Sequence, residues 1–404
     1  MLTRRAERDE RDGADSRPET SFLSPRRELR GWGEAWRISV PAPWVDHLDT
    51  VSEALSSIEH RDLDSTAESD RCTSHPHGSG PVAFAALPFD RSAPAEFIVP
   101  SWLLGTTPDG QRWVTHLDGL EQPEPTPEFP APRSLSLSTP MTAAAWKESV
   151  AAATRRIAAG ELDKVVLSRA LEVIADVAFD PHVIAARLAA AHPHAYRYDI
   201  DGFVGATPEL LVSRFDDVVR AHPMAGTTPR TGDPTIDSAQ ASELLHSPKN
   251  RGEHQITIDM VLDTLLGFTS FVDAAPAPSV VAAGSVQHLA TEVEGRLSEP
   301  AASVLDLVAA LHPTPAVGGR PRDTALALIS ELEGDDRGPY AGPVGWVDAR
   351  GNGAWAVALR GAHIEGNRAR LRAGVGVVAD SDPDSEFAET QAKFTSVLAA
   401  ITRL

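Results

Sequence analysis

Lys164 and Glu209 are the two residues whose types and positions best suit acid–base chemistry. Lys164 opens the apolar stretch KVVLS, and Glu209 stands between Pro208 and an apolar run in GATPELLVS. Solvated residues at strand starts are the ordinary alternative for both. If both face a cleft, burial favours the neutral amine of the lysine and the protonated acid of the glutamate. The two residues then predict the base and the acid of one active site.

Three carboxylates predict a cation site. Glu386 and Glu389 are three residues apart in SEFAETQAK, so on a helix both project to one face. Glu253, in KNRGEHQ, adds a third carboxylate. Such hard oxygen donors suit Mg²⁺ with its remaining waters. The alternative is a surface ion pair between Glu389 and Lys393, which follows it by four residues.

An arginine and several glycines predict contacts to an anion. Arg360 interrupts the apolar run AWAVALRG, and a buried arginine needs a protein acid or an anionic ligand. Gly226, Gly374 and Gly376 stand where strands are expected to end, and glycine there lets a backbone N–H approach a ligand closely.

The elements that position these residues alternate in type along the chain. Helical periodicity predicts helices over 143–159, 238–245, 249–266, 301–311 and 321–332, and from Ser385 onward. Many β-branched runs lie between them without strict βαβ alternation, which favours an α+β fold with antiparallel sheets. The chain divides into a disordered N-terminal tail (1–28), a divergent N-terminal part of the fold (29–120), a Pro-rich connector (121–139) and a catalytic region (140–404).

Composition limits the class of protein. The net charge of −20 argues against a nucleic-acid surface, which requires clustered Lys and Arg. The single cysteine, Cys72, excludes an intrachain disulfide. No apolar run approaches the roughly 20 residues of a membrane span, and the charged N-terminus does not resemble a signal peptide. We therefore expect a soluble, cytoplasmic protein without a membrane or nucleic-acid partner. No surface signature demands an oligomer, so we expect a monomer.

Ten motifs occur in the order typical of one enzyme family. They are KVVLSR (164–169), GATPELLV (205–212), MAGTTPR (224–230), KNRGEHQ (249–255), VQHLATEVEG (286–295), HPTPAVGG (312–319), ELEGDDRGPYAGPVGW (331–346), ALRGAHI (358–364), RAGVGVV (372–378) and SEFAETQAK (385–393). With them the sequence resembles the chorismate-utilising enzymes, which include anthranilate synthase component I, and within them the isochorismate synthases. The resemblance covers the chain from about residue 160 onward. It implies two large antiparallel sheets packed together and flanked by helices.

The resemblance also implies a reaction, the Mg²⁺-dependent conversion of chorismate to isochorismate. Lys164 would activate the water that attacks C2 of the ring, and Glu209 would protonate the departing C4 hydroxyl. Glu253 and Glu389 would hold Mg²⁺, which binds the ring carboxylate, and Glu386 would support it through water.

The resemblance implies a substrate pocket as well. Arg360 would bind the pyruvyl carboxylate, helped by the backbone at Gly374 and by Tyr340. The remaining expected substrate contacts are Gly226, His288, Thr291, Ala316, Val317 and Lys393. The product would enter the biosynthesis of menaquinone or of a siderophore.

A few positions separate the members of this family. Lys164 indicates water as the nucleophile, whereas relatives that use ammonia usually have Gln there. Ala225 replaces the lysine on which aminodeoxychorismate synthases depend. Val317 resembles the aliphatic residue of isochorismate synthases, whereas salicylate synthases usually have Thr. A salicylate synthase, and a catalytically inactive chorismate-binding member, are the alternatives.

Two positions depart from the pattern of isochorismate synthases. Gly252 stands where a His is frequent, and Phe387 replaces a common Trp.

Overall fold

Two large antiparallel sheets make up most of the molecule. The computed structural model describes residues 2–4, 20–63, 76–117 and 129–403. The first sheet has the order β1 (Leu2–Arg4), β4 (Trp36–Val40), β7 (Ala95–Val99), β6 (Val82–Ala86), β22 (Pro343–Asp348), β23 (Gly353–Val357), β14 (Leu210–Phe215), β15 (Val218–His222), β20 (Val293–Leu297) and β17 (Thr269–Ala274). The strands before residue 100 thus form one side of this sheet, and β6 joins them to the later strands by pairing with β22.

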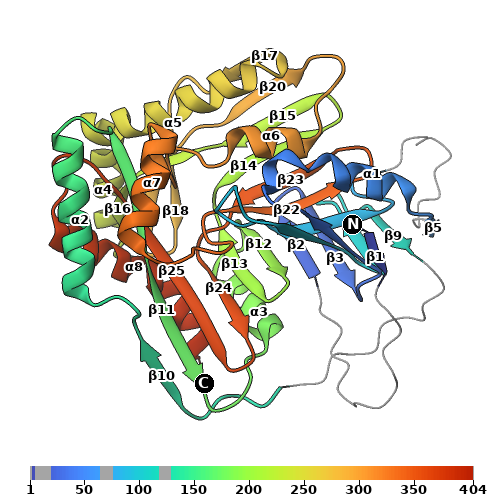
Figure 1. Cartoon of the computed structure of the whole chain (residues 1–404), viewed down its shortest axis with the longest axis horizontal. Helices are drawn as coiled ribbons and strands as arrows, with labels where there is room; N and C mark the ends of the chain where they lie inside the picture. The colour runs from blue at the N-terminus through green and yellow to red at the C-terminus, as the bar shows by residue number, and fades with distance from the viewer. Residues whose placement is uncertain (1, 5–19, 64–75, 118–128, 404) are drawn as a thin grey trace.

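The second sheet contains the longest strands. Its order is β10 (Leu135–Ser138), β11 (Lys164–Ala175), β25 (Arg368–Val377), β24 (Gly361–Glu365), β13 (Phe203–Thr207), β12 (Tyr196–Ile200), β2 (Thr20–Ser24), β3 (Arg27–Trp32), β8 (Trp102–Thr106), β9 (Arg112–His116) and β5 (Arg61–Leu63), with β21 (Gly319–Arg320) paired to β11. A third, small sheet is formed by β16 (Met224–Pro229), β19 (Val286–Ala290) and β18 (Ser279–Ala283). β11 and β25 cross the molecule side by side (Figure 1).

Helices cover the outer sides of the sheets. They are α1 (Asp49–Ser57), α2 (Ala143–Ala158), α3 (Pro181–Ala191), α4 (Pro234–His246), α5 (Pro248–Leu266), α6 (Val304–Leu311), α7 (Arg322–Glu333) and α8 (Pro383–Thr402), together with the 3₁₀ turn η1 (Trp44–Asp46). α8 packs on β25 and α7 on β11. None of the helices in the described ranges is long and apolar enough to cross a membrane. The expected α+β architecture of two large antiparallel sheets with flanking helices is confirmed.

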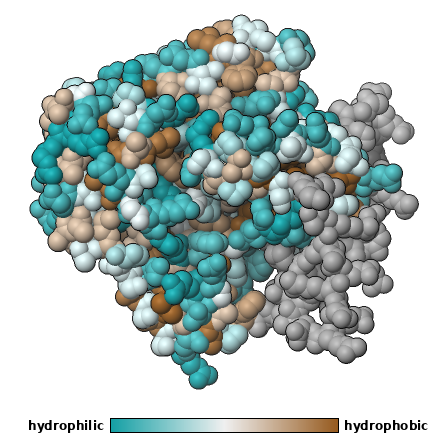
Figure 2. All heavy atoms as spheres, viewed as in Figure 1, coloured by the Kyte–Doolittle hydropathy of each residue, from teal (hydrophilic) through white to brown (hydrophobic). Residues whose placement is uncertain are grey.

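Aromatic side chains fill the space between the two large sheets. Phe22 and Tyr198 from the second sheet share one buried cluster with Phe84 and Trp346 from the first. Burial of such rings removes about 150–250 Å² each from water and contributes most of the packing energy at this interface. The exterior is different: on the face shown in Figure 2, hydrophilic residues predominate and apolar residues lie in scattered small groups.

The two helices that carry the predicted metal ligands have well-defined starts. The Ser247 hydroxyl accepts a hydrogen bond from the Asn250 N–H at the start of α5, and Asp382 accepts one from Ser385 N–H at the start of α8. A proline follows each cap in the first helical turn, where its missing N–H costs nothing. The caps therefore define where each helix begins, and with it the turn of the helix on which Glu253 or Glu386 stands.

The expectation of a disordered tail over 1–28 is wrong for the residues that the structure describes there. Thr20–Ser24 forms β2, which pairs with β12 and β3, and Leu2–Arg4 forms β1. The reason is that Phe22 and Leu23 point into buried positions even though charged residues surround them in the sequence. The connector over 121–139 is also shorter than predicted, because Leu135–Ser138 forms the edge strand β10. Residues 5–19, the segment that contains Cys72, and 118–128 lie outside the described residues.

Candidate active site

A cavity of about 320 Å³ collects nearly all of the predicted site residues. It lies where the ends of β11 and β25 meet α5, α8 and the small sheet. Of the predicted residues, those that line it are Lys164, Glu209, Gly226, Glu253, His288, Ala316, Val317, Tyr340, Arg360, Gly374, Glu386, Glu389 and Lys393. Segments that are more than 200 residues apart in the sequence therefore meet at one place.

Lys164 enters the cavity from the first residue of β11. Its side chain passes over Gly376 on the neighbouring strand, where a Cβ atom would lie 2.7 Å from Lys164 Cε. Glycine at 376 thus provides the space that this lysine needs. The ammonium group reaches Glu253 Oε2 on α5 at 3.3 Å, and the lysine side chain is 7% exposed.

Glu209 lies at the turn between β13 and β14 and is 4% exposed. Burial raises the pKa of its carboxyl from 4.5 to about 8, although a backbone hydrogen bond from Met224 and the charge of Lys164 oppose the shift. The group is therefore protonated at neutral pH, which is the state that a general acid requires.

α8 presents Glu386, Glu389 and Lys393 to the cavity on one face. Lys393 Nζ contacts Glu389 Oε1 at 2.6 Å and donates to the Gly374 carbonyl at 2.9 Å. Burial raises the pKa of Glu389, but Lys393, Arg360 and Lys164 outweigh it and hold that pKa below its ordinary value. The Glu389–Lys393 ion pair, the alternative to a cation site, therefore exists, but it lies in the cavity and not on the outer surface.

Arg360 approaches from the loop between β23 and β24, and its Nη1 donates to the Lys393 carbonyl at 3.2 Å. Its backbone φ is 51°, a left-handed conformation that is costly for a residue with a side chain. Ala341, beside Tyr340, is also left-handed, with φ of 64°. Backbone strain of this kind recurs at binding sites, and here it accompanies two of the side chains predicted to contact substrate.

The donor chemistry of the three cavity carboxylates fits a hard divalent cation. Glu386 illustrates this: burial, and then the nearby charge of Glu389, raise its pKa above the ordinary value. A cation between the two side chains would relieve that repulsion. Across the described ranges, however, no three acidic, histidine or cysteine groups converge closely enough to hold a metal. In this structure Glu253 and Glu389 are each paired with a lysine, and the two carboxylates do not converge on one position.

His288 and Thr291, both predicted to contact the substrate, differ in whether they line the cavity. His288 lines the cavity, and its Nδ1 lies 3.1 Å from Thr227 Oγ1 and 3.3 Å from the Gly226 carbonyl. Burial, with smaller effects from Arg360 and Lys393, lowers its pKa to about 3, so the ring is neutral. Thr291 does not line the cavity. Its hydroxyl lies 2.7 Å from His254 Nε2.

Two arginines of the cavity were missed by the sequence analysis. Arg337 and Arg372 line it, as do Lys249 and Asn250 at the start of α5. Arg372 has a weaker signal than Arg360, since it is the last of three alternating arginines (368–372) and stands directly before the apolar run AGVGVV. Arg337 lies among acidic and turn residues and has no such signal. Six basic and four acidic side chains line the cavity, and Glu209 is neutral, so an anion-attracting site exists within a net acidic protein.

A known protein family matches most of the chain. The family model described as "Chorismate binding enzyme" matches residues 107–402. The chain belongs to this family. The resemblance drawn from the ten motifs is therefore confirmed.

Characterised relatives share most of their length with the chain. Isochorismate synthase DhbC of Bacillus subtilis is 36% identical over 340 residues, covering 80% of this chain and 81% of the relative. Isochorismate synthase EntC of Escherichia coli (strain K12) is 33% identical over 384 residues, covering 93% of each. MenF, the menaquinone-specific isochorismate synthase of Escherichia coli, has the same fold, with a TM-score of 0.81 at 24% identity over 100% of this chain and 94% of that one.

Proposed function

We propose that this protein is an isochorismate synthase, an isomerase that converts chorismate to isochorismate. The observation that carries the proposal is the pairing of a buried, protonated Glu209 with Lys164 in one cation-rich cavity. The identity to isochorismate synthases over most of the chain supports it.

In the proposed reaction Lys164 acts as the base: its Nζ takes a proton from a water molecule as the water oxygen bonds to C2 of the ring. The ring double bonds shift, and the C4–O bond breaks. Glu209 donates its proton to the departing C4 hydroxyl, which leaves as water. One water is added and one is lost, so the product is an isomer of the substrate. Burial of Glu209 supports the role, because it keeps that proton in place at neutral pH.

Basic groups of the cavity account for binding of a dianionic substrate. We assign the pyruvyl carboxylate to Arg360, whose planar fork of donors suits a carboxylate. Tyr340 and the backbone at Gly374 lie beside it: a Cβ on Gly374 would be 3.3 Å from Tyr340 Oη. Neutral His288, together with Ala316, Val317 and Gly226, would contact the ring.

We further propose that the enzyme depends on Mg²⁺, held by Glu253, Glu386 and Glu389. When bound, the ion would neutralise a substrate carboxylate beside these acidic side chains. The oxygen-only donor set supports this assignment, as does the raised pKa of Glu386.

Product analysis tests the proposal. Purified protein is incubated with chorismate, with and without Mg²⁺, and the products are separated by chromatography. We expect a Mg²⁺-dependent isochorismate peak that approaches equilibrium with chorismate. Lys164→Ala, purified in the same way, controls for a contaminating synthase and should form no product. Absence of conversion by the unaltered protein would favour the inactive chorismate-binding alternative.

Salicylate with an equal amount of pyruvate would assign the protein to the salicylate synthases. Val317 disfavours that alternative, because its side chain lines the cavity and carries no hydroxyl. The expected monomeric state and cytoplasmic location stay proposals. Size-exclusion chromatography tests the first.

A further inference from the structure

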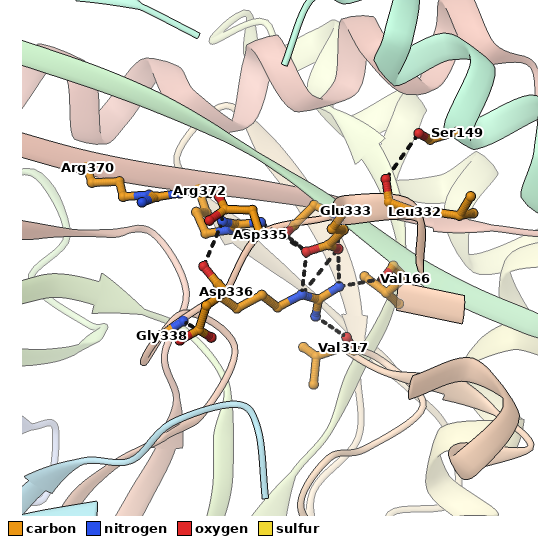
Figure 3. A network of polar contacts seen from close by, with 12 residues as sticks. Ser149, Val166, Val317, Leu332, Glu333, Asp335, Asp336, Gly338, Arg370 and Arg372 are labelled. Atoms are coloured by element: carbon orange, nitrogen blue, oxygen red, sulfur yellow. Dashed lines mark hydrogen bonds and ion pairs between the residues drawn. The ribbon is translucent and has the colours of Figure 1, made fainter. Parts of the chain in front are cut away.

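Glu333 is the centre of a buried network directly behind the cavity. It ends α7, and its side chain is 2% exposed. One carboxylate oxygen accepts from the Ser168 N–H at 2.6 Å and from Arg337 Nη2 at 2.5 Å. The other accepts from Ser168 Oγ, Arg337 Nε and Arg372 Nη2, each at 3.0 Å. In Figure 3, Glu333 lies between Arg372 and the guanidinium group from which a dashed line runs to Val317. That guanidinium belongs to Arg337.

Arg337 carries this network to the cavity wall. Its Nη1 donates to the Val317 carbonyl at 3.0 Å, and its Nη2 donates to the Val166 carbonyl at 2.7 Å. Phe89 stacks on the guanidinium, 4.2 Å from its central carbon. The guanidinium is therefore held by hydrogen bonds at its edge and by the Phe89 ring on one face. Val317 lines the cavity, and Val166 is two residues from Lys164, so one side chain connects the loop beside the ring to the strand of the proposed base.

Charge makes Glu333 indispensable to this arrangement. Its carboxylate is the group that holds Arg337 and Arg372 together, and Asp335 contacts Arg372 at 2.8 Å on the outer side. Without the charge of Glu333, two buried guanidinium groups would face each other across a neutral side chain. Like charges in such surroundings repel strongly, so Arg337 would leave its place.

We infer that Glu333, acting through Arg337, is a positioning residue that fixes the Val317 side chain against the substrate ring and so favours release of isochorismate over loss of pyruvate. This inference rests on the proposed function. In the competing reaction the hydrogen on C2 of isochorismate passes to the methylene carbon of the enolpyruvyl group as the C3–O bond breaks. The products are salicylate and pyruvate, with no other reactant. That transfer needs the enolpyruvyl group to fold over C2, and in this proposal the Val317 side chain occupies the space into which the group would fold.

The test compares Glu333→Gln and Arg337→Lys with the unaltered enzyme. The measurements are kcat and KM for chorismate, and the ratio of salicylate plus pyruvate to isochorismate. Glu333→Gln keeps the shape but loses the charge. Arg337→Lys keeps a charge but cannot bond Glu333 and both carbonyls at once. We expect kcat/KM to fall about 10- to 100-fold in both, with most of the change in KM, and the salicylate ratio to rise.

Asp348→Asn is the matched control. Asp348 is a second buried carboxylate, and it accepts from the N–H groups of Gly78, Arg350 and Asn352 in a turn that does not line the cavity. We expect this variant to melt at a lower temperature with KM and product ratio unchanged. If both network variants behave in the same way as this control, the inference is wrong. If Glu333→Gln does not fold, Arg337→Lys decides on the same criteria.

The outcome also separates the inference from the proposed function. An unaltered enzyme that makes no isochorismate refutes the function. An active unaltered enzyme whose network variants keep its KM and product ratio refutes the role of Glu333 alone.

Discussion

Glu209 should determine how the rate responds to alkaline pH. Its carboxyl must be protonated to act as the acid, and burial raises its pKa to about 8. We therefore expect kcat/KM to fall as the pH rises through about 8, because the folded enzyme then loses the proton. A pH–rate profile from pH 6 to 9.5 measures this. An alkaline limit that is absent, or that lies well above pH 9, would contradict the assignment of Glu209.

The same residue affects stability in a direction that can be worked out. The folded-state pKa lies above the unfolded value of 4.5, so between pH 4.5 and about 8 the folded state binds more protons than the unfolded state. The contribution of this group to stability is complete below pH 4.5 and is lost as the pH rises to about 8. Glu209→Gln does not titrate. The free energy of unfolding of the variant, taken relative to that of the unaltered protein at the same pH, should therefore increase from pH 5 to 8. Denaturant unfolding measures it. Equal pH dependence in both proteins would contradict the raised pKa.

Among single residues, the sequence predicted those that stand out from an apolar run. Lys164, Glu209 and Arg360 each interrupt or begin such a run, and each lines the cavity. Arg337 and Glu333 did not stand out, because charged residues at a helix end and in a turn are usually solvated. Their burial depends on strands that come from elsewhere in the chain, which local patterns do not encode.

At the scale of elements, Arg169 attaches helix α8 to strand β11. It is 4% exposed, donates to Thr390 Oγ1 and to Gln391 Oε1 at 2.8 Å each, and stacks on Phe387 at 4.3 Å. The helix residues that it contacts lie next to Glu389. The position of the proposed metal ligands thus depends on a cation that touches no ligand itself.

Arg169→Met should therefore weaken the response to Mg²⁺. The side chain keeps its length but loses both hydrogen bonds. Loss of a group that bonds a metal ligand directly typically costs 10- to 100-fold in metal affinity, and Arg169, which bonds the neighbours of Glu389, should cost about the lower figure. The measurement is the Mg²⁺ concentration that gives half-maximal rate, which we expect to rise about tenfold. Lys147→Met is the control, because Lys147 pairs with Asp384 on the exposed side of α8, and such pairs contribute only about 0–1 kcal/mol. Equal Mg²⁺ titrations for the two variants would contradict the role of Arg169.

Helices were easier to predict than strand partners. The expected helices over 143–159 and 249–266 correspond to α2 and α5 within a residue at each end. The run VVRAHPMAGT contains two strands, because it divides at Pro223 into β15 and β16, which belong to different sheets. Helical hydrogen bonds close within a few residues, whereas a strand finds its partner at long range. α3 was missed altogether.

At the scale of the whole molecule, the N-terminal and C-terminal parts of the chain cannot be separated. In the first sheet β6 pairs with β22, and in the second β2 pairs with β12. Phe22, Phe84 and Trp346 then share one core cluster between the sheets. The division into 29–120 and 140–404 therefore reflects a difference in sequence composition and not two separate folding units. Both parts contribute strands to the same sheets.

The protein should accordingly unfold without releasing its N-terminal strands first. We expect tryptophan fluorescence, which reports on Trp44 and Trp113 as well as Trp346 and Trp355, to change together with far-UV circular dichroism in urea. The core links these positions, so their environments should be lost together. Two separate transitions, with an intermediate between them in which only the C-terminal part is folded, would contradict this expectation.

The location of Lys393 in the last helix has a consequence for how the enzyme is made. Lys393 contacts Glu389 and the carbonyl of Gly374, and its own carbonyl accepts from Arg360, so the cavity wall is completed by residues that are translated more than 200 positions after Lys164. β2 leaves the ribosome well before β12, with which it pairs and whose residues follow more than 170 positions later. The site therefore stays incomplete in a nascent chain until α8 has been made. Messages that end early, or chains trimmed before α8, should yield protein with no residual activity instead of a weaker enzyme.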